Sequence, residues 1–135
     1  MLKLLRLSFL PQSTDCGLLI LRLSLGFSML LLHGRGKAQG FSELSAKFPA
    51  LFGLPSTVNL GLAVFAEVVC SALLIAGFLT RFAALMLAAT MATAFFLVHK
   101  MILVGEGNGE LAMIYLAGYL TLLFAGAGKW SVDRQ

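Results

Sequence analysis

The chain has 135 residues, of which 59% are hydrophobic and 12% are charged, and its mean hydropathy is +0.94. A soluble globular domain carries roughly 25% charged residues, so this composition excludes a soluble cytosolic enzyme and a disordered chain. The formal charge is +4, but the ten Lys and Arg residues are scattered among apolar runs. This scatter excludes nucleic acid as a partner and indicates a membrane protein whose partner is the lipid bilayer.

The N-terminal residues 1–13 contain a short apolar run with two basic residues, MLKLLRLSFL. This run resembles the start of a signal peptide, but Pro11, Gln12 and Ser13 interrupt it and no small-residue cleavage site follows. We therefore expect residues 1–13 to stay on the protein as a segment that lies in the membrane interface.

Four stretches are long and apolar enough for membrane-spanning helices, which need roughly 17 to 25 mainly apolar residues. The first is interrupted only by Arg22 and the second only by Glu67. The stretches cover residues 16–34, 58–79, 82–99 and 110–127. A single transmembrane domain is predicted, with no separate soluble domain.

The links between the stretches differ in kind. Within Lys37–Thr57, Phe41, Leu44, Phe48 and Leu51 recur at near-helical spacing. This spacing predicts an amphipathic interfacial segment between helices 1 and 2 that forms a short helix rather than a disordered loop. The next link is predicted to consist of Thr80 and Arg81 alone, and GEGNG at 105–109 is a glycine-rich turn. The predicted fold is therefore all-α, an integral membrane antiparallel four-helix bundle.

An even number of spans places both termini on one side of the membrane. Basic residues are slightly more numerous on that side, which favours cytoplasmic termini in a multi-pass protein of the bacterial inner membrane. The terminal side would carry Lys3, Arg6, Arg81, Lys129 and Arg134, against Arg35, Lys37, Lys47 and Lys100 on the other.

Charged residues within the spans are the strongest indication of a site. A charge at the bilayer centre costs about 2.5 kcal/mol or more, so we expect Arg22 and Glu67 to point inward and toward each other. The alternative is an ion pair that only fixes helix register. The bundle geometry brings His33, His99 and Glu110 to one end, which favours a functional cavity.

The two histidines admit other interpretations. Each stands at the end of a span, where imidazole is stable at the headgroup boundary. On spans one and three they could instead hold a haem, or a metal together with Glu110. Haem or metal is the minor alternative, because the sequence has no HxxxH or ExxH spacing.

Several motifs follow one another along the chain in a characteristic order. The series begins at Arg22 and continues through HGRGK at 33–37 and GF at 40–41. It then passes through Glu67, LLIAGFLTR at 73–81, NGELAMIYLAG at 108–118 and GAGKWSVD at 126–133. In this order the motifs resemble the DoxX family of small bacterial membrane proteins.

The resemblance implies a four-helix membrane bundle associated with respiratory and redox systems, as a component of a membrane oxidoreductase rather than an enzyme by itself. Relatives are linked to quinones and catechols, and no catalytic mechanism or catalytic residue is settled for the family. We therefore predict a redox-associated subunit that binds a quinone or a similar small amphiphile. The alternative is a non-catalytic assembly or scaffold subunit.

Electron transfer would need an external cofactor, because the chain offers no electron-carrying group. A redox partner protein and further copies of the same chain are the expected protein partners. The predicted ligand-binding residues are Arg22, His33, Lys37, Glu67, His99, Asn108 and Glu110.

Overall fold

All the regular structure in a computed structural model of the protein, which describes residues 1–134, is helical. Three helices are long and apolar enough to cross a membrane, Thr14–Gln39, Ser56–Ala76 and Thr80–Val98. A fourth apolar helix, α8 (Glu110–Ala125), is shorter at 16 residues. The expectation of an all-α protein with membrane-spanning helices is confirmed.

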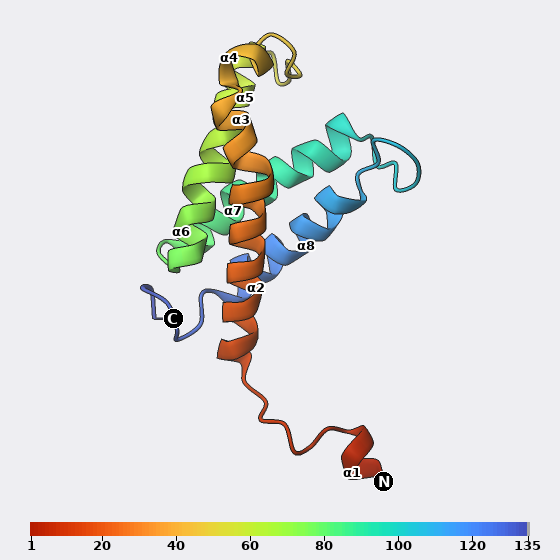
Figure 1. Cartoon of the computed structure of the whole chain (residues 1–135), viewed down its shortest axis with the longest axis vertical. Helices are drawn as coiled ribbons and strands as arrows, with labels where there is room; N and C mark the ends of the chain where they lie inside the picture. Colours follow the sequence, from red (N-terminus) through yellow and green to blue (C-terminus); the bar gives the residue numbers. More distant parts are fainter. Residues whose placement is uncertain (135) are drawn as a thin grey trace.

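The first long helix is one column built from α2 (Thr14–Met29), the π-helical turn η1 (Leu30–Gly34) and α3 (Arg35–Gln39) (Figure 1). Ser13 caps its start, because the Ser13 side chain accepts a hydrogen bond from the Cys16 amide at 3.1 Å. The column extends beyond residue 34, where the first span was predicted to end.

The second long helix combines α5 (Ser56–Val64), the π-helical segment η2 (Phe65–Cys70) and α6 (Ser71–Ala76). A tight turn follows, in which Gly77 has φ +69° and Leu79 has φ +50°. The third long helix, α7 (Thr80–Thr93) with η3 (Ala94–Val98), begins directly after this turn.

The prediction that Thr80 and Arg81 form the second link is wrong, because both residues lie in α7. The reversal occurs at residues 77–79, where Gly77 adopts the left-handed conformation that ends a helix and that glycine allows without strain. The prediction missed this turn because it looked for charged residues between the spans, whereas Phe78 and Leu79 are apolar.

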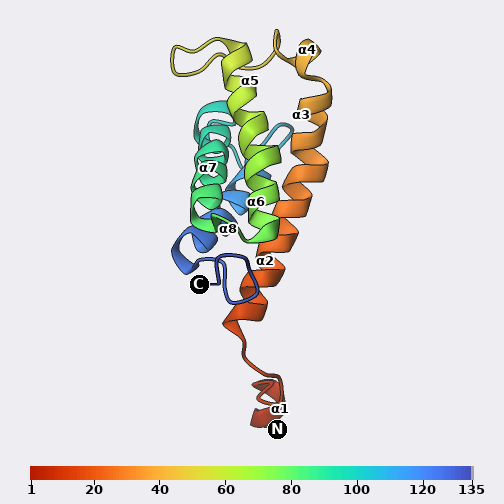
Figure 2. The ribbon, with the colours of Figure 1, turned by 90° about the vertical axis from the view of Figure 1, so that its left-hand side faces the viewer.

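Figure 2 shows the columns α2–α3 and α5–α6 side by side, with α7 and α8 packed together next to them. Glycines permit the close contacts: a Cβ atom at Gly26 would lie 2.6 Å from Ile75 Cγ1, and one at Gly118 would lie 2.5 Å from Leu25 Cδ1. Small residues at helix interfaces are typical of membrane proteins. α1 (Leu2–Leu5) lies apart from these helices, and residues 1–14 are exposed.

The link between the first two columns contains only one further short helix, α4 (Phe41–Leu44). The chain from Ser45 to Pro55 is irregular, since Pro49 and Pro55 lack the backbone N–H that a helix needs and Gly53 has a φ of +71°. The predicted amphipathic segment is therefore helical only over its first turn.

The C-terminal segment, residues 126–134, folds back onto the base of α2, where Arg22 holds it. The Arg22 guanidinium donates hydrogen bonds to the carbonyl of Ala127 at 2.8 Å and to that of Trp130 at 2.6 Å. The expectation that Arg22 faces Glu67 is wrong. The guanidinium donates instead to backbone carbonyls of an irregular segment. The hydropathy of the spans does not predict where such carbonyls lie.

Asp133, in the same C-terminal segment, caps the start of α7. Its carboxylate accepts hydrogen bonds from the amides of Leu79 at 2.9 Å and Thr80 at 2.8 Å. Partial burial disfavours the charged form, but these hydrogen bonds and the nearby Arg22 guanidinium outweigh it and hold the pKa of Asp133 below its ordinary value.

We expect Asp133→Ala to lower the free energy of unfolding at pH 7 by about 1 kcal/mol, the usual effect of losing a helix cap. Because the folded-state pKa is depressed, the contribution of Asp133 is present above the unfolded pKa, about 3.9, and is lost as the pH falls through the lower folded-state value. Thermal melting in mild detergent from pH 7 to pH 2.5 should show the two proteins converging. A difference that stays constant down to pH 2.5 would contradict this role.

Candidate functional site

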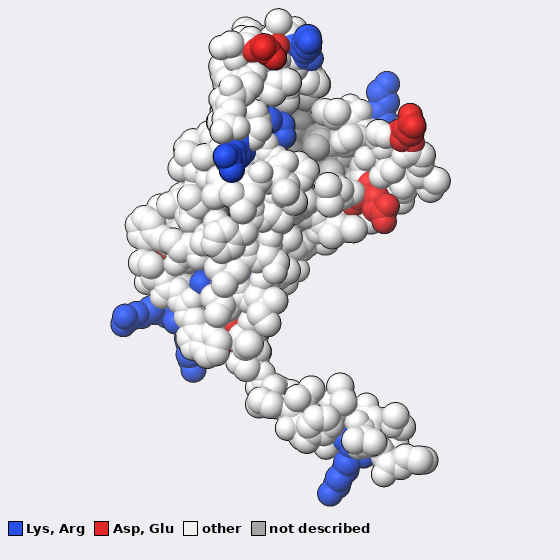
Figure 3. Space-filling view, viewed as in Figure 1, with Lys and Arg blue, Asp and Glu red and all other residues white. Residues whose placement is uncertain are grey.

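A cavity of about 510 Å³ lies between the upper ends of the helices, within the 300 to 1,000 Å³ range of ligand pockets. Figure 3 shows the surface hollowed at this end of the molecule. The walls are mainly apolar and come from every long helix, from α8 and from the irregular link before α5. The apolar lining residues include Met29, Phe48, Leu51, Phe52, Leu62, Ala63, Met86, Ala94, Val98, Leu111 and Ala112.

An ion pair between Lys37 and Glu67 is the only charged contact at the cavity among residues 1–134. Lys37 Nζ, from α3, lies 2.7 Å from Glu67 Oε2, from η2. The Glu67 side chain is 4% exposed and the Lys37 side chain 27%, so the ammonium reaches from the cavity to a buried carboxylate. Lys37, and not Arg22, is therefore the partner of the buried acid.

Two π-helical turns carry His33 and Glu67 at the cavity. His33 lies in η1 and Glu67 in η2, and π-helical turns are rare and occur frequently at functional sites. The two turns touch through Gly34, where a Cβ atom would lie 2.6 Å from the carbonyl oxygen of Glu67. The absence of a side chain at Gly34 thus lets the backbones that carry His33 and Glu67 meet.

Aromatic and hydroxyl groups continue the site on α8. The His33 ring meets Tyr115 edge to face, with centroids 5.7 Å apart, and the Tyr115 hydroxyl donates to Ser28 Oγ at 2.8 Å. Tyr115 in turn stacks on Tyr119 at 5.9 Å. These contacts fix the His33 imidazole at the cavity wall.

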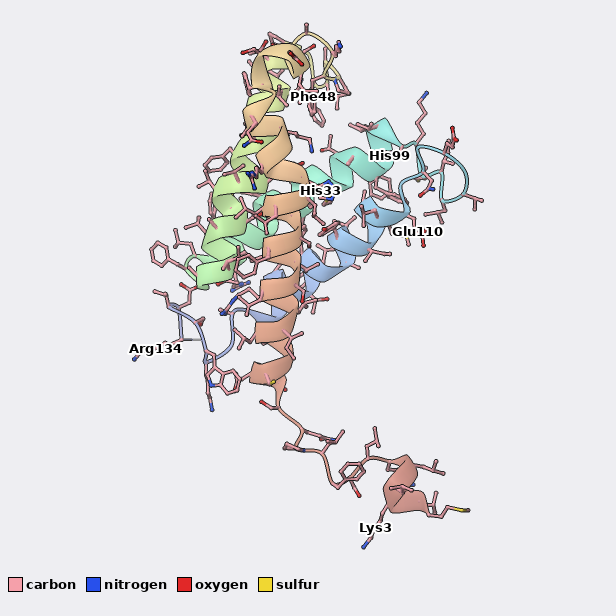
Figure 4. The ribbon with its side chains drawn as sticks, in the orientation of Figure 1. Lys3, His33, Phe48, His99, Glu110 and Arg134 are labelled. Atoms are coloured by element: carbon pink, nitrogen blue, oxygen red, sulfur yellow. The ribbon has the colours of Figure 1, made fainter. Side chains whose placement is uncertain are left out.

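His99 and Asn108 lie at the opposite wall, where they stabilise the loop before α8. His99 Nδ1 is 2.6 Å from the Gly107 carbonyl, and Asn108 Oδ1 accepts from the Glu110 amide at 3.0 Å. Figure 4 shows both imidazoles in the upper half of the molecule, with His33 on the first column and His99 at the end of the third long helix.

The structure brings five of the seven predicted site residues to the cavity wall and leaves two outside. The five are His33, Lys37, Glu67, His99 and Asn108. Arg22 holds the C-terminal segment instead, and the exposed Glu110 begins α8 without lining the cavity. Within residues 1–134, no three His, Cys, Asp or Glu side chains are grouped to hold a metal ion.

Asn59 is a polar cavity residue that the sequence reasoning missed. It is buried, and its Nδ2 group donates to the carbonyls of Leu51 and Leu54 at 3.1 Å and of Pro55 at 3.3 Å. These bonds hold the irregular link, which contributes Phe48 and Phe52 to the cavity wall. The sequence did offer one indication of this residue, since Asn59 is the only polar side chain in the apolar run VNLGLAV.

We expect Asn59→Leu, which keeps the branched shape but removes the donor, to lower the free energy of unfolding by about 1 to 3 kcal/mol and to loosen residues 48–55. Hydrogen exchange of the amides in this link should become faster, whereas the exposed control Thr57→Ala should leave it unchanged. Unaltered exchange in Asn59→Leu would show that the link is held without this side chain.

Comparison with known proteins places this geometry in a family context. The DoxX family model matches residues 17–100. A protein from Haemophilus influenzae is 36% identical over 115 residues, which cover 79% of this chain and 81% of that protein. Another from the same organism is 36% identical over 96 residues, which cover 69% of this chain and 64% of that protein. Both are described as uncharacterized proteins, and no solved structure matches this chain.

Proposed function

This chain belongs to the DoxX family of membrane proteins, and from that premise we propose that it binds a quinone or a similar small amphiphile in the cavity beside Glu67. The observation that carries the proposal is a mainly apolar cavity of about 510 Å³ with a buried acid, a lysine and an imidazole at its wall. Such a pocket suits a ligand with an apolar body and a few polar groups.

The polar groups fit both forms of a quinone-like ring. A carbonyl oxygen of the ring would accept a hydrogen bond from an N–H of Lys37, which retains donors beyond the one directed at Glu67. A ring hydroxyl would donate to the carboxylate of Glu67. The ring itself would lie against the apolar walls, where Met29, Leu62 and Tyr115 contribute surface.

The proposed setting is an antiparallel four-helix bundle in the bacterial inner membrane, with α8 as the fourth span. Both termini lie toward the same end in Figures 1 and 2, as an even number of spans requires. Basic side chains project from both ends in Figure 3, and the small excess on the side of the termini, five residues against four, is what favours cytoplasmic termini. Residues 1–13 would lie in the interface, and electrons would pass to or from a separate redox protein. Self-association of the chain remains a prediction.

Glu67→Gln is expected to weaken binding of a short-chain ubiquinol analogue by about tenfold or more, because a hydrogen bond to a charged acceptor contributes about 1.5 to 3 kcal/mol. Titration calorimetry of the purified protein in mild detergent measures this affinity. Glu110→Gln is the control: it removes an exposed carboxylate outside the cavity and should leave the affinity for the quinol unchanged.

If Glu67→Gln binds the quinol as tightly as the unmutated protein does, Glu67 does not contact the ligand. If the unmutated protein binds neither the quinone nor the quinol form, the assembly or scaffold subunit becomes the better account. The ion pair would then serve helix register alone.

A further inference from the structure

Below the cavity, the helices bury polar atoms that have no hydrogen-bond partner within the described residues. They are Arg22 Nε, Ser71 Oγ and Tyr119 Oη. The exposed fraction is 2% for Arg22 and zero for Ser71 and Tyr119. A polar group left unpaired away from water is costly, and buried polar groups that protein atoms do not satisfy are commonly satisfied by ordered water.

The position of Ser71 relative to Glu67 follows from the second helical column, where Ser71 comes four residues after Glu67, about 6 Å along a helix. Contacts with the first column agree in direction. Gly34 lies against the backbone of Glu67, and a Cβ atom at Gly26 would lie 3.3 Å from the carbonyl of Ser71. Ser71 therefore lies below Glu67, on the side away from the cavity.

The other helices bring further unpaired groups to the lower levels. Gly118, which precedes Tyr119 in the chain, packs against Leu25. Leu25 precedes Gly26, which packs against Ser71, so Tyr119 and Ser71 lie at a similar level. One turn lower, a Cβ atom at Gly77 would lie 2.7 Å from the Arg22 guanidinium. The residues that carry the unpaired groups thus lie at successive levels of the interior, with Ser71 and Tyr119 above Arg22.

We propose that Tyr119, Ser71 and Arg22 bind a chain of internal water molecules that extends from the floor beneath Glu67 to the C-terminal segment. Water suits this site because each hydroxyl and the Arg22 Nε–H can donate to it, while each water can donate onward to the next oxygen. Arg22, which donates to the carbonyls of Ala127 and Trp130, lies at the C-terminal end of this chain. The inference does not depend on the identity of any cavity ligand.

X-ray radiolytic footprinting tests for the water directly, because hydroxyl radicals formed from a bound water label the side chains beside it. After correction for intrinsic reactivity, we expect Tyr119 to be labelled several-fold faster than Leu122, a control of equal burial on the same helix. Labelling of Tyr119 as slow as that of Leu122 would overturn the proposal.

Stability changes test whether the hydroxyls share the same water. Tyr119→Phe and Ser71→Ala should each lower Tm by about 3 °C if bound water is lost, and the double variant should lower it by less than the sum of the two. If the hydroxyls are unpaired, removing either one should raise Tm, because an unsatisfied buried group disappears. A raised Tm in both single variants would refute the water chain, and additive losses would refute the shared connection. Thr121→Val, at an exposed hydroxyl on α8, is the control.

Discussion

Lys37→Met is expected to lower the free energy of unfolding by about 3 kcal/mol or more, because it leaves the carboxylate of Glu67 buried without a cation. Glu67 is 4% exposed and its ion-pair distance to Lys37 Nζ is 2.7 Å. Removing one partner of a buried pair typically costs 3 to 5 kcal/mol, and the partial exposure of Lys37 places the expected loss near the lower limit. Equilibrium unfolding in mixed detergent micelles measures it.

A second substitution separates lost charge pairing from lost packing. The double variant Lys37→Met, Glu67→Gln removes both charges and should recover most of the stability, since a buried pair replaced as a whole is often nearly neutral. Lys47→Met, at an exposed lysine in the link before α5, should have little effect. If the double variant is as unstable as Lys37→Met alone, the methylene stem of Lys37 matters more than its charge.

Gly34→Ala is expected to destabilise the protein by about 3 kcal/mol, the upper part of the range for overpacking. The new Cβ atom would lie 2.6 Å from the carbonyl oxygen of Glu67 and 2.8 Å from its carbonyl carbon. Backbone atoms cannot rotate aside as a side chain can, so η1 and η2 would have to separate. The separation should also weaken the Lys37–Glu67 pair and ligand binding.

Gly36→Ala provides the matched control for this steric argument. It changes the same residue type in the same helical column, but no atom lies within 4 Å of the position of its Cβ. Replacement of an exposed helical glycine by alanine should stabilise the protein by up to about 1 kcal/mol. The two alanine variants are therefore expected to change Tm in opposite directions, and equal changes would show that close contact at Gly34 is not required.

Length and hydropathy were sufficient to predict the long apolar helices of this protein, but they located the turns poorly. Long apolar runs predict helices because a backbone in lipid must satisfy its hydrogen bonds internally. The turn after α6 was misplaced because it has no polar residue before Thr80 and depends on the backbone conformation of Gly77 and Leu79. The link before α5 was predicted to be helical because Phe48 and Leu51 fit the spacing, whereas both line the cavity.

The sequence alone determined that Arg22 and Glu67 would be turned away from lipid, since an ionised side chain in an apolar span must find a polar environment. Only the tertiary structure decided the partner of each. Helical periodicity specifies the face on which a residue lies, but a long side chain such as Lys37 or Arg22 can reach acceptors on several levels. The C-terminal segment has no periodicity to predict its path, and it supplies the carbonyls that hold Arg22. Glu67 therefore pairs with Lys37 instead of Arg22. Both residues lie at the wall of a cavity that forms only when all the helices pack together.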